Sequence, residues 1–335
     1  MPLPKALAGR LALPVVGAPM FIVSSPALVI AQCRSGILGC FPSLNARPEE
    51  ALARWIAEIR AALAGDPKAA PFGVNLIVNK ANRRLIRDTE ICIRAEVPLV
   101  ITSLQAPGEI VAAVHGYGGL VFHDVTTLRH AEKAAEHGVD GLILVCAGAG
   151  GHAGTLSPFA LMAEVRRFFP GTILLAGAIA DGRAVLAAQA MGADLAYIGT
   201  RFIATAEANA SGAYKQMLVD CAARHVVYTP HFTGVSGNYL GPSIEGAGIE
   251  LSALAAAAPG GSYRSSADKP AAWRDIWSAG QGVGSIDDVP SVAELVARLT
   301  KEYRAAAREL TQAMRRFPSP AAGHAPLPPQ GGEDG

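Results

Sequence analysis

Short apolar runs alternate with longer amphipathic stretches between residues 13 and 207 of the chain. Runs such as GLILVC (141–146) and TILLAG (172–177) are apolar throughout, which is typical of parallel strands buried on both faces. The stretches between the runs are interpreted as helices, because parallel strands need crossover connections of this length. The pattern predicts eight strand–helix units. Their strands are expected at Leu13–Val16, Ile37–Phe41, Phe72–Ile77, Pro98–Thr102, Leu120–His123, Gly141–Cys146, Thr172–Leu175 and Leu195–Ile198.

Eight such units favour an α/β fold whose strands close into a (β/α)8 barrel, also called a TIM barrel. An open doubly wound sheet shares the same alternation and is the structural alternative. In a barrel, ligands bind at the end where the strands run into the following helices. The turns after the predicted strands are therefore the expected location of a functional site.

The alternation stops after residue 207, which divides the chain into four expected parts. Residues 1–207 form the barrel, and 208–290 form a small, mostly helical second domain with loops near the site. Apolar positions 292, 295, 296, 299 and 303 predict one long amphipathic helix within 291–317 that packs on the barrel. The composition of 318–335 cannot build a core, so this tail is expected to be disordered.

Composition and charge exclude several classes of protein. The 335 residues are 50% hydrophobic and only 17% charged, which excludes a disordered chain. A net charge of +1 shows no basic excess, so no nucleic-acid partner is expected. No apolar run is long enough to span a membrane, and LALPVVGAPMFIV (11–23) is interpreted as a buried strand rather than a signal peptide because prolines interrupt it. Five cysteines without a CxxC pair indicate neither a disulfide framework nor a metal site, and favour a reducing, cytoplasmic location.

Glycine-rich turns follow the seventh and eighth predicted strands. The first contains Gly177 and Ala178, and the second contains Gly199 and Thr200. The turns after these two strands commonly bind phosphate in barrels, since glycine lets backbone N–H groups approach an anion and a following helix adds its positive end. The alternative interpretation is that each glycine only permits a tight turn and binds no phosphate. No GxxxxGK[ST] motif is present, so a P-loop nucleotide site is not supported.

One histidine stands out in the turn after the sixth predicted strand. His152 follows Gly150 and Gly151, whose lack of side chains leaves the imidazole open to the barrel mouth. An imidazole titrates near neutrality, so His152 is the candidate acid or base. His123 also ends a predicted strand. Two interpretations of it are left open: a contact with substrate, or a hydrogen bond within the rim of the barrel. Cys146 is interpreted as a buried thiol rather than a nucleophile, because no basic neighbour activates it.

Five segments together resemble the nitronate monooxygenase family, also called 2-nitropropane dioxygenase-like. They are GAPM (17–20), GVNL (73–76), AGGHAG (149–154), AGAIADGRAVLAAQAMGADLAYIGTRFIAT (176–205) and WSAGQGVGSIDD (277–288). The resemblance covers about residues 13–207 and 277–300. It implies an FMN-binding TIM barrel, with a small helical second domain, that is an oxidoreductase.

The resemblance also assigns roles to individual residues. His152 matches the catalytic histidine of the family. The implied FMN contacts are Ala18, Pro19 and Met20 of the first turn, Asn75, Gly150, Gly151, the phosphate turns Gly177–Ala178 and Gly199–Thr200, and, less directly, Gln281 with Gly282. Asn238, Tyr239, Gln281 and His123 are candidates for the substrate side. Two positions depart from the family: Ala178 stands where many members have glycine, and Asp124 stands near the place of a basic residue.

The implied reaction is oxidation of an alkyl nitronate, the anion of a nitroalkane, by FMN and O2 to a carbonyl compound and nitrite. His152 would remove the α-proton of a neutral nitroalkane or, when protonated, hold the anion. The alternative on the same barrel is an NAD(P)H-dependent FMN reductase of quinones or enoyl thioesters. A non-catalytic barrel that binds a phosphorylated ligand is a third reading, since fold does not fix function. The chain is expected to be a monomer or homodimer without membrane attachment.

Overall fold

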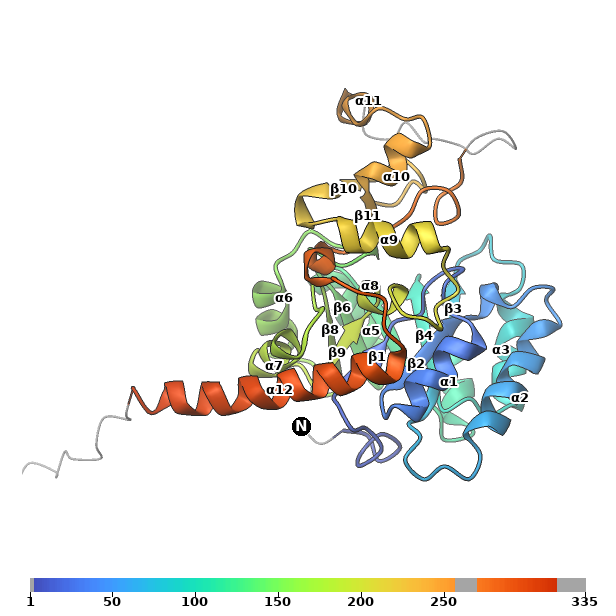
Figure 1. Ribbon diagram of the computed structural model, residues 1–335. Coiled ribbons are helices and arrows are strands. Elements are labelled where there is room, and N and C mark those ends of the chain that lie inside the picture. Colours follow the sequence, from blue (N-terminus) through green and yellow to red (C-terminus); the bar gives the residue numbers. More distant parts are fainter. Residues whose placement is uncertain (1–2, 257–269, 318–335) are drawn as a thin grey trace, which may run out of the picture.

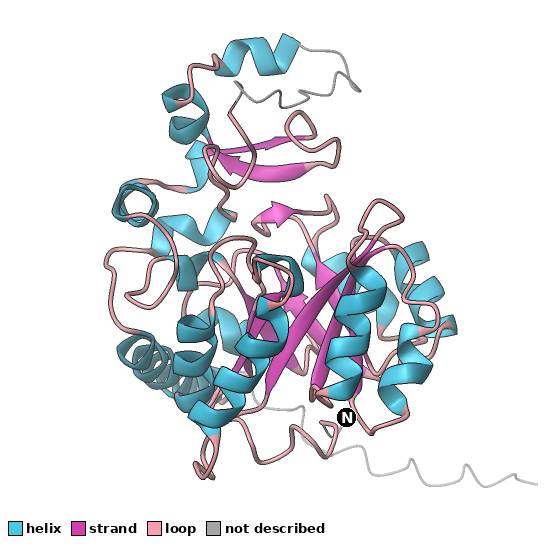
Figure 2. Cartoon of the chain, turned by 90° about the vertical axis from the view of Figure 1, so that its right-hand side faces the viewer, coloured by secondary structure: helices cyan, strands magenta, loops and turns pink. Residues whose placement is uncertain are grey.

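Eight parallel strands close into a barrel in the computed structural model, which describes residues 3–256 and 270–317. The first and last strands of the barrel pair with each other, Val16 opposite Tyr197, so the predicted TIM barrel is confirmed and the open sheet is excluded. Figure 2 shows the strands in the centre with helices around them. The barrel strands are β1 (Val15–Gly17), β2 (Leu38–Pro42), β3 (Phe72–Val78), β4 (Leu99–Leu104), β5 (Leu120–Val125), β6 (Gly141–Val145), β8 (Thr172–Ala176) and β9 (Leu195–Ile198).

The inward-facing residues of the strands form two layers. Side chains alternate between the two faces of a strand, so every second residue points into the barrel. The lower layer is apolar and fully buried, with members such as Ile101, Phe122 and Ile143. The upper layer, two residues further along each strand, faces an open cavity instead. It contains one residue from each strand or the turn that follows it: Ala18, Pro42, Asn75, Ser103, Asp124, Val145, Ala176 and Tyr197.

Helices cover the outside of the barrel and complete the predicted alternation. The first of them begins at Pro26, where a proline fits because the first helical N–H needs no partner. The helix after the eighth barrel strand has only four residues, so its dipole adds less to an anion site than expected. The barrel helices are α1 (Pro26–Arg34), α2 (Ala51–Leu63), α3 (Leu85–Arg94), α4 (Ile110–His115), α5 (Leu128–Glu136), α6 (Pro158–Val165), α7 (Gly182–Ala190) and α8 (Thr200–Ile203), with the short 3-10 turn η1 (Ser43–Asn45).

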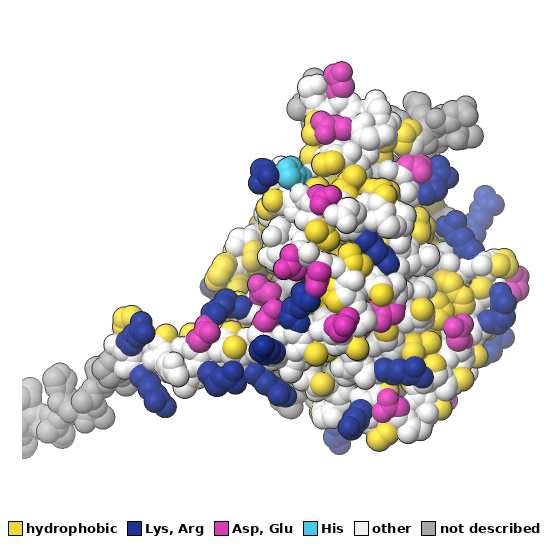
Figure 3. Space-filling view, viewed as in Figure 1, with side chains coloured by type: hydrophobic (Ala, Val, Ile, Leu, Met, Phe, Trp, Pro, Cys, Tyr) yellow, Lys and Arg dark blue, Asp and Glu magenta, His cyan; other side chains and the backbone are white. Residues whose placement is uncertain are grey.

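The long helix α12 (Val292–Met314) packs against α7 and α1 on the side of the barrel. Ser291 caps its first turn and Glu294 bonds back to the Ser291 N–H, a capping box that fixes where the helix starts. Its buried face is apolar, and the carboxylate of Glu302 accepts a bond from the Gly182 N–H of α7 at 2.8 Å. Figure 1 shows the C-terminal half of α12 extending beyond the barrel, and Figure 3 shows basic and acidic side chains along it.

A small appendage lies over the end of the barrel where the strands terminate (Figures 1 and 2). It contains α9 (Gly212–Asp220), α10 (Gly241–Gly246) and α11 (Leu251–Ala256), with the 3-10 turns η2 (Ala223–His225) and η3 (Gln281–Ser285). It also contains a three-stranded antiparallel sheet that the sequence pattern did not predict, in the order β10 (Val226–Thr229), β11 (Gly237–Leu240), β7 (Gly151–His152). The third of these strands belongs to the loop after β6, so the sheet ties the barrel to the appendage.

The predicted disordered tail, 318–335, lies outside the described residues. Within the described part of the chain, none of the helices combines the length and apolar character needed to cross a bilayer. All five cysteines are buried and none is in a disulfide.

Candidate active site

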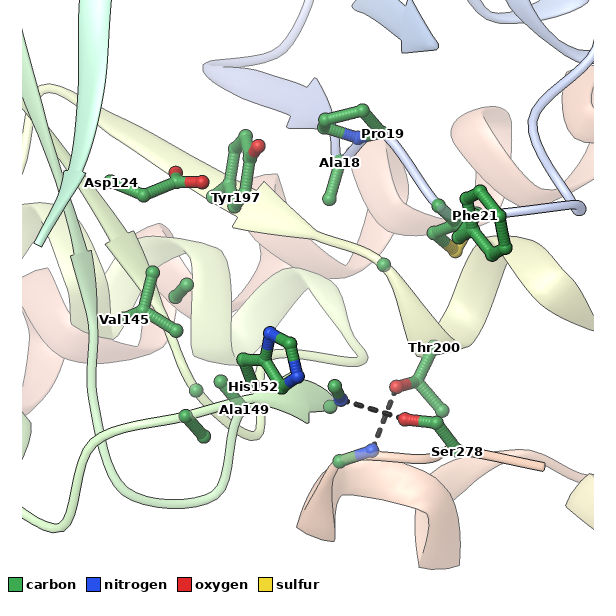
Figure 4. A pocket seen from close by; sticks show the side chains of 18 of the residues that line it. Ala18, Pro19, Phe21, Asp124, Val145, Ala149, His152, Tyr197, Thr200 and Ser278 are labelled. Carbon is green, nitrogen blue, oxygen red and sulfur yellow. Dashed lines mark hydrogen bonds between the residues drawn. The ribbon is translucent and has the colours of Figure 1, made fainter. Parts of the chain in front are cut away.

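A cavity of about 750 Å³ opens at the C-terminal ends of the barrel strands, beneath the appendage. It is lined by the residues that the sequence analysis proposed for catalysis or cofactor binding, with the exception of Gln281. These are Ala18, Pro19, Met20, Asn75, Gly150, Gly151, His152, Gly177, Ala178, Gly199 and Thr200. Segments from Ala18 to Ser278, far apart in the chain, therefore converge on one site, as Figure 4 shows for its labelled members. The individual roles of these residues stay predictions.

The His152 side chain lies at the mouth of the cavity, between the barrel and the appendage. Its backbone pairs with Gly237 of β11, and its ring packs edge-on against Trp273 with the ring centroids 5.5 Å apart. Its Nε2 atom lies 2.8 Å from the Thr233 hydroxyl. That hydroxyl donates its own proton to the Val235 carbonyl at 3.0 Å, so it accepts from His152 and Nε2 carries a proton. Neutral His152 then keeps the lone pair on Nδ1, the nitrogen that is able to take up a proton.

The environment of His152 favours the neutral imidazole. Burial beneath the appendage lowers the pKa of His152 from its ordinary value of 6.5. At pH 7 the ring is therefore mainly uncharged, which suits a general base.

Hydrogen bonds from the appendage hold the loop that carries His152. The Ser278 hydroxyl accepts from the Gly151 N–H at 2.7 Å and donates to the Asn238 carbonyl at 2.8 Å. The Asn238 amide donates to the Ala149 carbonyl at 2.6 Å. These groups are buried, so each bond also satisfies a polar group that would be costly to leave unpaired. The loop is consequently held in place by residues that are distant in sequence, of which Figure 4 labels Ser278.

The two turns proposed for phosphate lie side by side at the ends of β8 and β9. Gly177 has a φ of 138°, and a Cβ there would lie 2.8 Å from the Ala147 carbonyl oxygen, so only glycine fits. The next residue, Ala178, has a φ of 55° in the left-handed region, which explains in physical terms why glycine suits this position and alanine is strained. Its N–H donates to the Gly148 carbonyl at 3.3 Å, a long bond with which an anion would compete.

Backbone strain concentrates around the cavity. Of the non-glycine residues with positive φ, Leu104, Ala178 and Trp273 line the cavity, and Ile22 lies between two residues that do. Such conformations cost about 1–3 kcal/mol each and persist where the surroundings impose them, which is common at functional sites.

The floor of the cavity is polar on one side only. On β3, β4 and β5, the Asn75 amide donates to the Ser103 hydroxyl at 2.7 Å, and Ser103 donates to Asp124 at 2.5 Å. Burial raises the pKa of Asp124 to about 6 and that of Tyr197, on β9, well above 10. Sequence analysis missed Ser103, Asp124 and Tyr197 as floor residues. For Asp124 the sequence did hold a signal. Phe122 and Asp124 are two residues apart on β5 and so share the face that points into the barrel.

The same alternation corrects the open reading of His123. Because Phe122 and Asp124 point inward, His123 points outward toward the helices, where it is 4% exposed and bonds the Thr102 hydroxyl at 2.8 Å. Burial lowers its pKa to about 4. Its geometry is that of a hydrogen bond within the barrel wall rather than a substrate contact.

Three further candidates for the substrate side also lie outside the cavity lining. Asn238 is buried and holds the His152 loop, because its amide is used by a backbone carbonyl. Tyr239 is fully buried and stacks on Trp273, with ring centroids 5.2 Å apart, so it supports a lining residue from behind. Gln281 is exposed behind Gly148, while its neighbours Gly280 and Gly282 line the cavity. Cys146 is buried, and burial raises the pKa of its thiol to about 12. This agrees with its interpretation as a structural thiol rather than a nucleophile.

A closed (β/α)8 barrel with a glycine-rich mouth and the imidazole of His152 at the rim is the arrangement of a TIM-barrel enzyme. The family model described as nitronate monooxygenase matches residues 6–302, so the chain belongs to the nitronate monooxygenase family. It is therefore a flavin-dependent oxidoreductase, as predicted.

Individual relatives are distant from this chain. A nitronate monooxygenase of Paraburkholderia phytofirmans is 24% identical, over 89% of this chain and 94% of its own. The (3aS,4S,5R,7aS)-5-hydroxy-7a-methyl-1-oxo-octahydro-1H-indene-4-carboxyl-CoA dehydrogenase of Mycobacterium tuberculosis is 29% identical over 66% of this chain, and the match spans only 61% of that relative. Among solved structures, nitroalkane oxidase from Streptomyces ansochromogenes is 25% identical with a TM-score of 0.76, covering 91% of this chain and all of the other.

Proposed function

We propose that this protein oxidises alkyl nitronates, and the nitroalkanes from which they form, with O2 to carbonyl compounds and nitrite. The observation that carries the proposal is the position of His152. Its imidazole shares one cavity with the glycine turns after β8 and β9, and its bond to Thr233 leaves Nδ1 unprotonated. Membership of the nitronate monooxygenase family supports the same substrate class.

We further propose FMN as the flavin. The residues present fit it: Gly177 is held in a conformation that only glycine adopts without strain, and the cavity floor carries a buried carboxyl oxygen of Asp124 without a partner. The turns at Gly177–Ala178 and Gly199–Thr200 would hold the phosphate, and Met20 and Asn75 would border the ring. When bound, the flavin supplies the electron acceptor that the side chains lack.

His152 manages the proton in this proposal. Neutral His152 takes the α-proton of a nitroalkane on Nδ1, while the bond from Nε2 to Thr233 keeps the ring in one orientation. The resulting imidazolium holds the nitronate by a charge-assisted hydrogen bond. Trp273, Val235 and the other apolar lining residues exclude water from the site, which strengthens that bond.

The direct test is His152→Ala. The variant is expected to fold and keep its flavin absorbance but to lose at least about a hundredfold in kcat/KM with a nitroalkane at pH 7, the usual range for a general base. His137→Ala is the matched control, because His137 is an exposed histidine at the C-cap of α5, outside the cavity lining. Unchanged turnover in His152→Ala would remove this residue from the mechanism.

The second candidate function is an NAD(P)H-dependent flavin reductase of quinones or enoyl thioesters. One observation favours it: the name of the Mycobacterium tuberculosis relative specifies a coenzyme A thioester as substrate. Anaerobic mixing separates the two functions. Rapid bleaching of the flavin by NADH or NADPH supports the reductase, whereas bleaching by a nitronate alone supports the oxidation of nitronates.

We also retain a cytoplasmic location, since all five thiols are free. The state of assembly, monomer or homodimer, stays a prediction that size-exclusion chromatography with light scattering decides.

A further inference from the structure

The loop that connects β1 to α1, residues 18–25, forms one wall of the cavity. Its lining residues are Ala18, Pro19, Met20, Phe21 and Val23, three of which Figure 4 labels. The wall reaches the second of the two glycine turns. A Cβ atom added to Gly199 would lie 3.5 Å from the Ala18 Cβ and 3.6 Å from the Met20 sulfur, so both side chains lie directly beside Gly199. The course of this loop therefore sets the shape of the cavity next to the turn proposed for phosphate.

The loop is held in a conformation that its own residues disfavour. Ile22 has a φ of 69°, in the left-handed region, where a β-branched side chain is strained. Such a conformation persists only where the surrounding structure imposes it. Groups outside the loop must therefore fix the backbone around Ile22.

The side chain of Asn45 supplies three hydrogen bonds that fix this backbone. Asn45 lies in η1, the 3-10 turn after β2. Its Oδ1 atom accepts from the Ile22 N–H at 2.9 Å, and its Nδ2 atom donates to the carbonyls of Met20 at 2.9 Å and Ser24 at 2.8 Å. The amide fits these partners in one orientation only, because the N–H can only donate and the carbonyls can only accept. An ionised aspartate would keep the first bond but would face two carbonyl oxygens with no proton to donate.

Asn45 is in turn held in place by Arg84, which precedes α3. The guanidinium group of Arg84 donates to the Ser43 carbonyl at 3.2 Å and to the Ala46 carbonyl at 2.9 Å, so it binds the backbone before and after Asn45. The buried carboxylate of Asp88 holds the guanidinium group itself, at 3.1 Å. The Asn45 amide is therefore fixed before any ligand binds, which is what a group that orients an active-site loop requires.

We propose that Asn45 is a positioning residue of the active site: by holding the backbone of Met20, Ile22 and Ser24, it keeps the Met20 side chain beside Gly199. The inference rests on the proposed binding of FMN, since Asn45 would act on the flavin only through this wall of the cavity. The chain also offers a matched control. The Asn209 side chain holds the same loop from the exposed side, through a bond to the Ile22 carbonyl at 3.0 Å.

The test measures both the affinity for FMN and the environment of the bound flavin, on the full chain reconstituted after flavin removal. Asn45→Asp is expected to raise the dissociation constant of FMN at least about tenfold, the scale of one or two lost hydrogen bonds. It is also expected to change the visible circular dichroism of the flavin at saturating FMN, because Met20 loses its fixed position. Asn209→Ala is expected to stay within about threefold of wild type and to leave the dichroism unchanged.

The dichroism separates positioning from a general loss of stability, which would not alter the spectrum of flavin that is bound at saturation. If Asn45→Asp does not fold, Asn45→Ala removes the same three bonds without adding a charge. Wild-type affinity, or weaker binding with an unchanged spectrum, overturns the inference. Equal effects of the Asn45 and Asn209 variants overturn it too, because any loosening of the loop would then suffice. Absence of FMN binding by the wild-type protein is a different failure: it refutes the proposed cofactor, and the inference with it.

Discussion

Replacing Asp124 by asparagine should stabilise the flavin-free protein at neutral and alkaline pH. The carboxyl group is buried, its Oδ1 atom has no partner, and it pairs with no cation among the described residues. Asparagine has nearly the same shape, and its amide oxygen still accepts from Ser103. The substitution therefore removes the cost of a buried charge while it leaves the packing in place.

The magnitude follows from the pKa of Asp124. Burial raises this pKa from 3.8 to about 6, so the folded state disfavours the ionised form. The difference corresponds to about 3 kcal/mol of lost stability once both states are ionised, at 1.36 kcal/mol per pH unit. Because the folded pKa is above the unfolded one, this penalty is absent below about pH 4, grows between pH 4 and 6 and is complete above pH 6. Loss of the charge-assisted bond from Ser103 offsets about 1 kcal/mol of the gain.

Urea unfolding at pH 4 and pH 8 measures the effect. We expect Asp124→Asn to exceed wild type by about 2 kcal/mol at pH 8 and to match it within about 1 kcal/mol at pH 4. Asp181→Asn is the control, because Asp181 caps α7 from the protein surface and asparagine caps a helix equally well. Cys40 and Tyr197 are the titratable groups that interact electrostatically with Asp124, and burial raises the pKa of each well above its ordinary value. Both groups therefore stay neutral at pH 4 and at pH 8. A difference between wild type and Asp124→Asn that is the same at both pH values would refute the reasoning.

Three other substitutions or conditions probe the remaining features of the site. Ser278→Ala leaves the partly buried Gly151 N–H without its acceptor and should cost about 1–3 kcal/mol in urea unfolding and weaken flavin binding. Gly199→Asp sets a negative charge against the proposed phosphate turn and should reduce the FMN content of the purified protein by roughly tenfold, as measured by absorbance; full occupancy contradicts that placement. With a neutral nitroalkane, kcat/KM should fall as the pH drops through the pKa of His152, at a midpoint below 6.5 because burial lowers that pKa; a midpoint above 6.5 counts against His152 as the base.

The barrel was predictable because its signal is local and repeated. Apolar runs of four to six residues, each followed by an amphipathic stretch, predicted both the number of barrel strands and their order. The location of Gly177, Gly199 and His152 around one cavity was also predictable, because the carboxyl ends of all barrel strands meet at the same end of the barrel. Their roles in binding phosphate and in catalysis stay predictions.

The features that were missed depend on contacts between distant segments. Strands β10 and β11 are short and β7 has two residues, so their pairing reflects tertiary contacts rather than a periodic pattern. Asn238 and Tyr239 were placed near the substrate, but only the fold shows that they support the His152 loop and Trp273 from behind. The sequence analysis noted Asp124 as a departure from the family. That its side chain points into the cavity follows only when the bounds of β5 are known, because alternate residues of a strand share one face.

His152 is bonded to the appendage as well as to the barrel. Its backbone pairs with Gly237 of β11, and its Nε2 atom lies 2.8 Å from the Thr233 hydroxyl. If the proposed role of His152 as the base holds, a substrate that entered by displacing the appendage would displace the imidazole with it, and proton transfer would have to wait until the appendage was seated again.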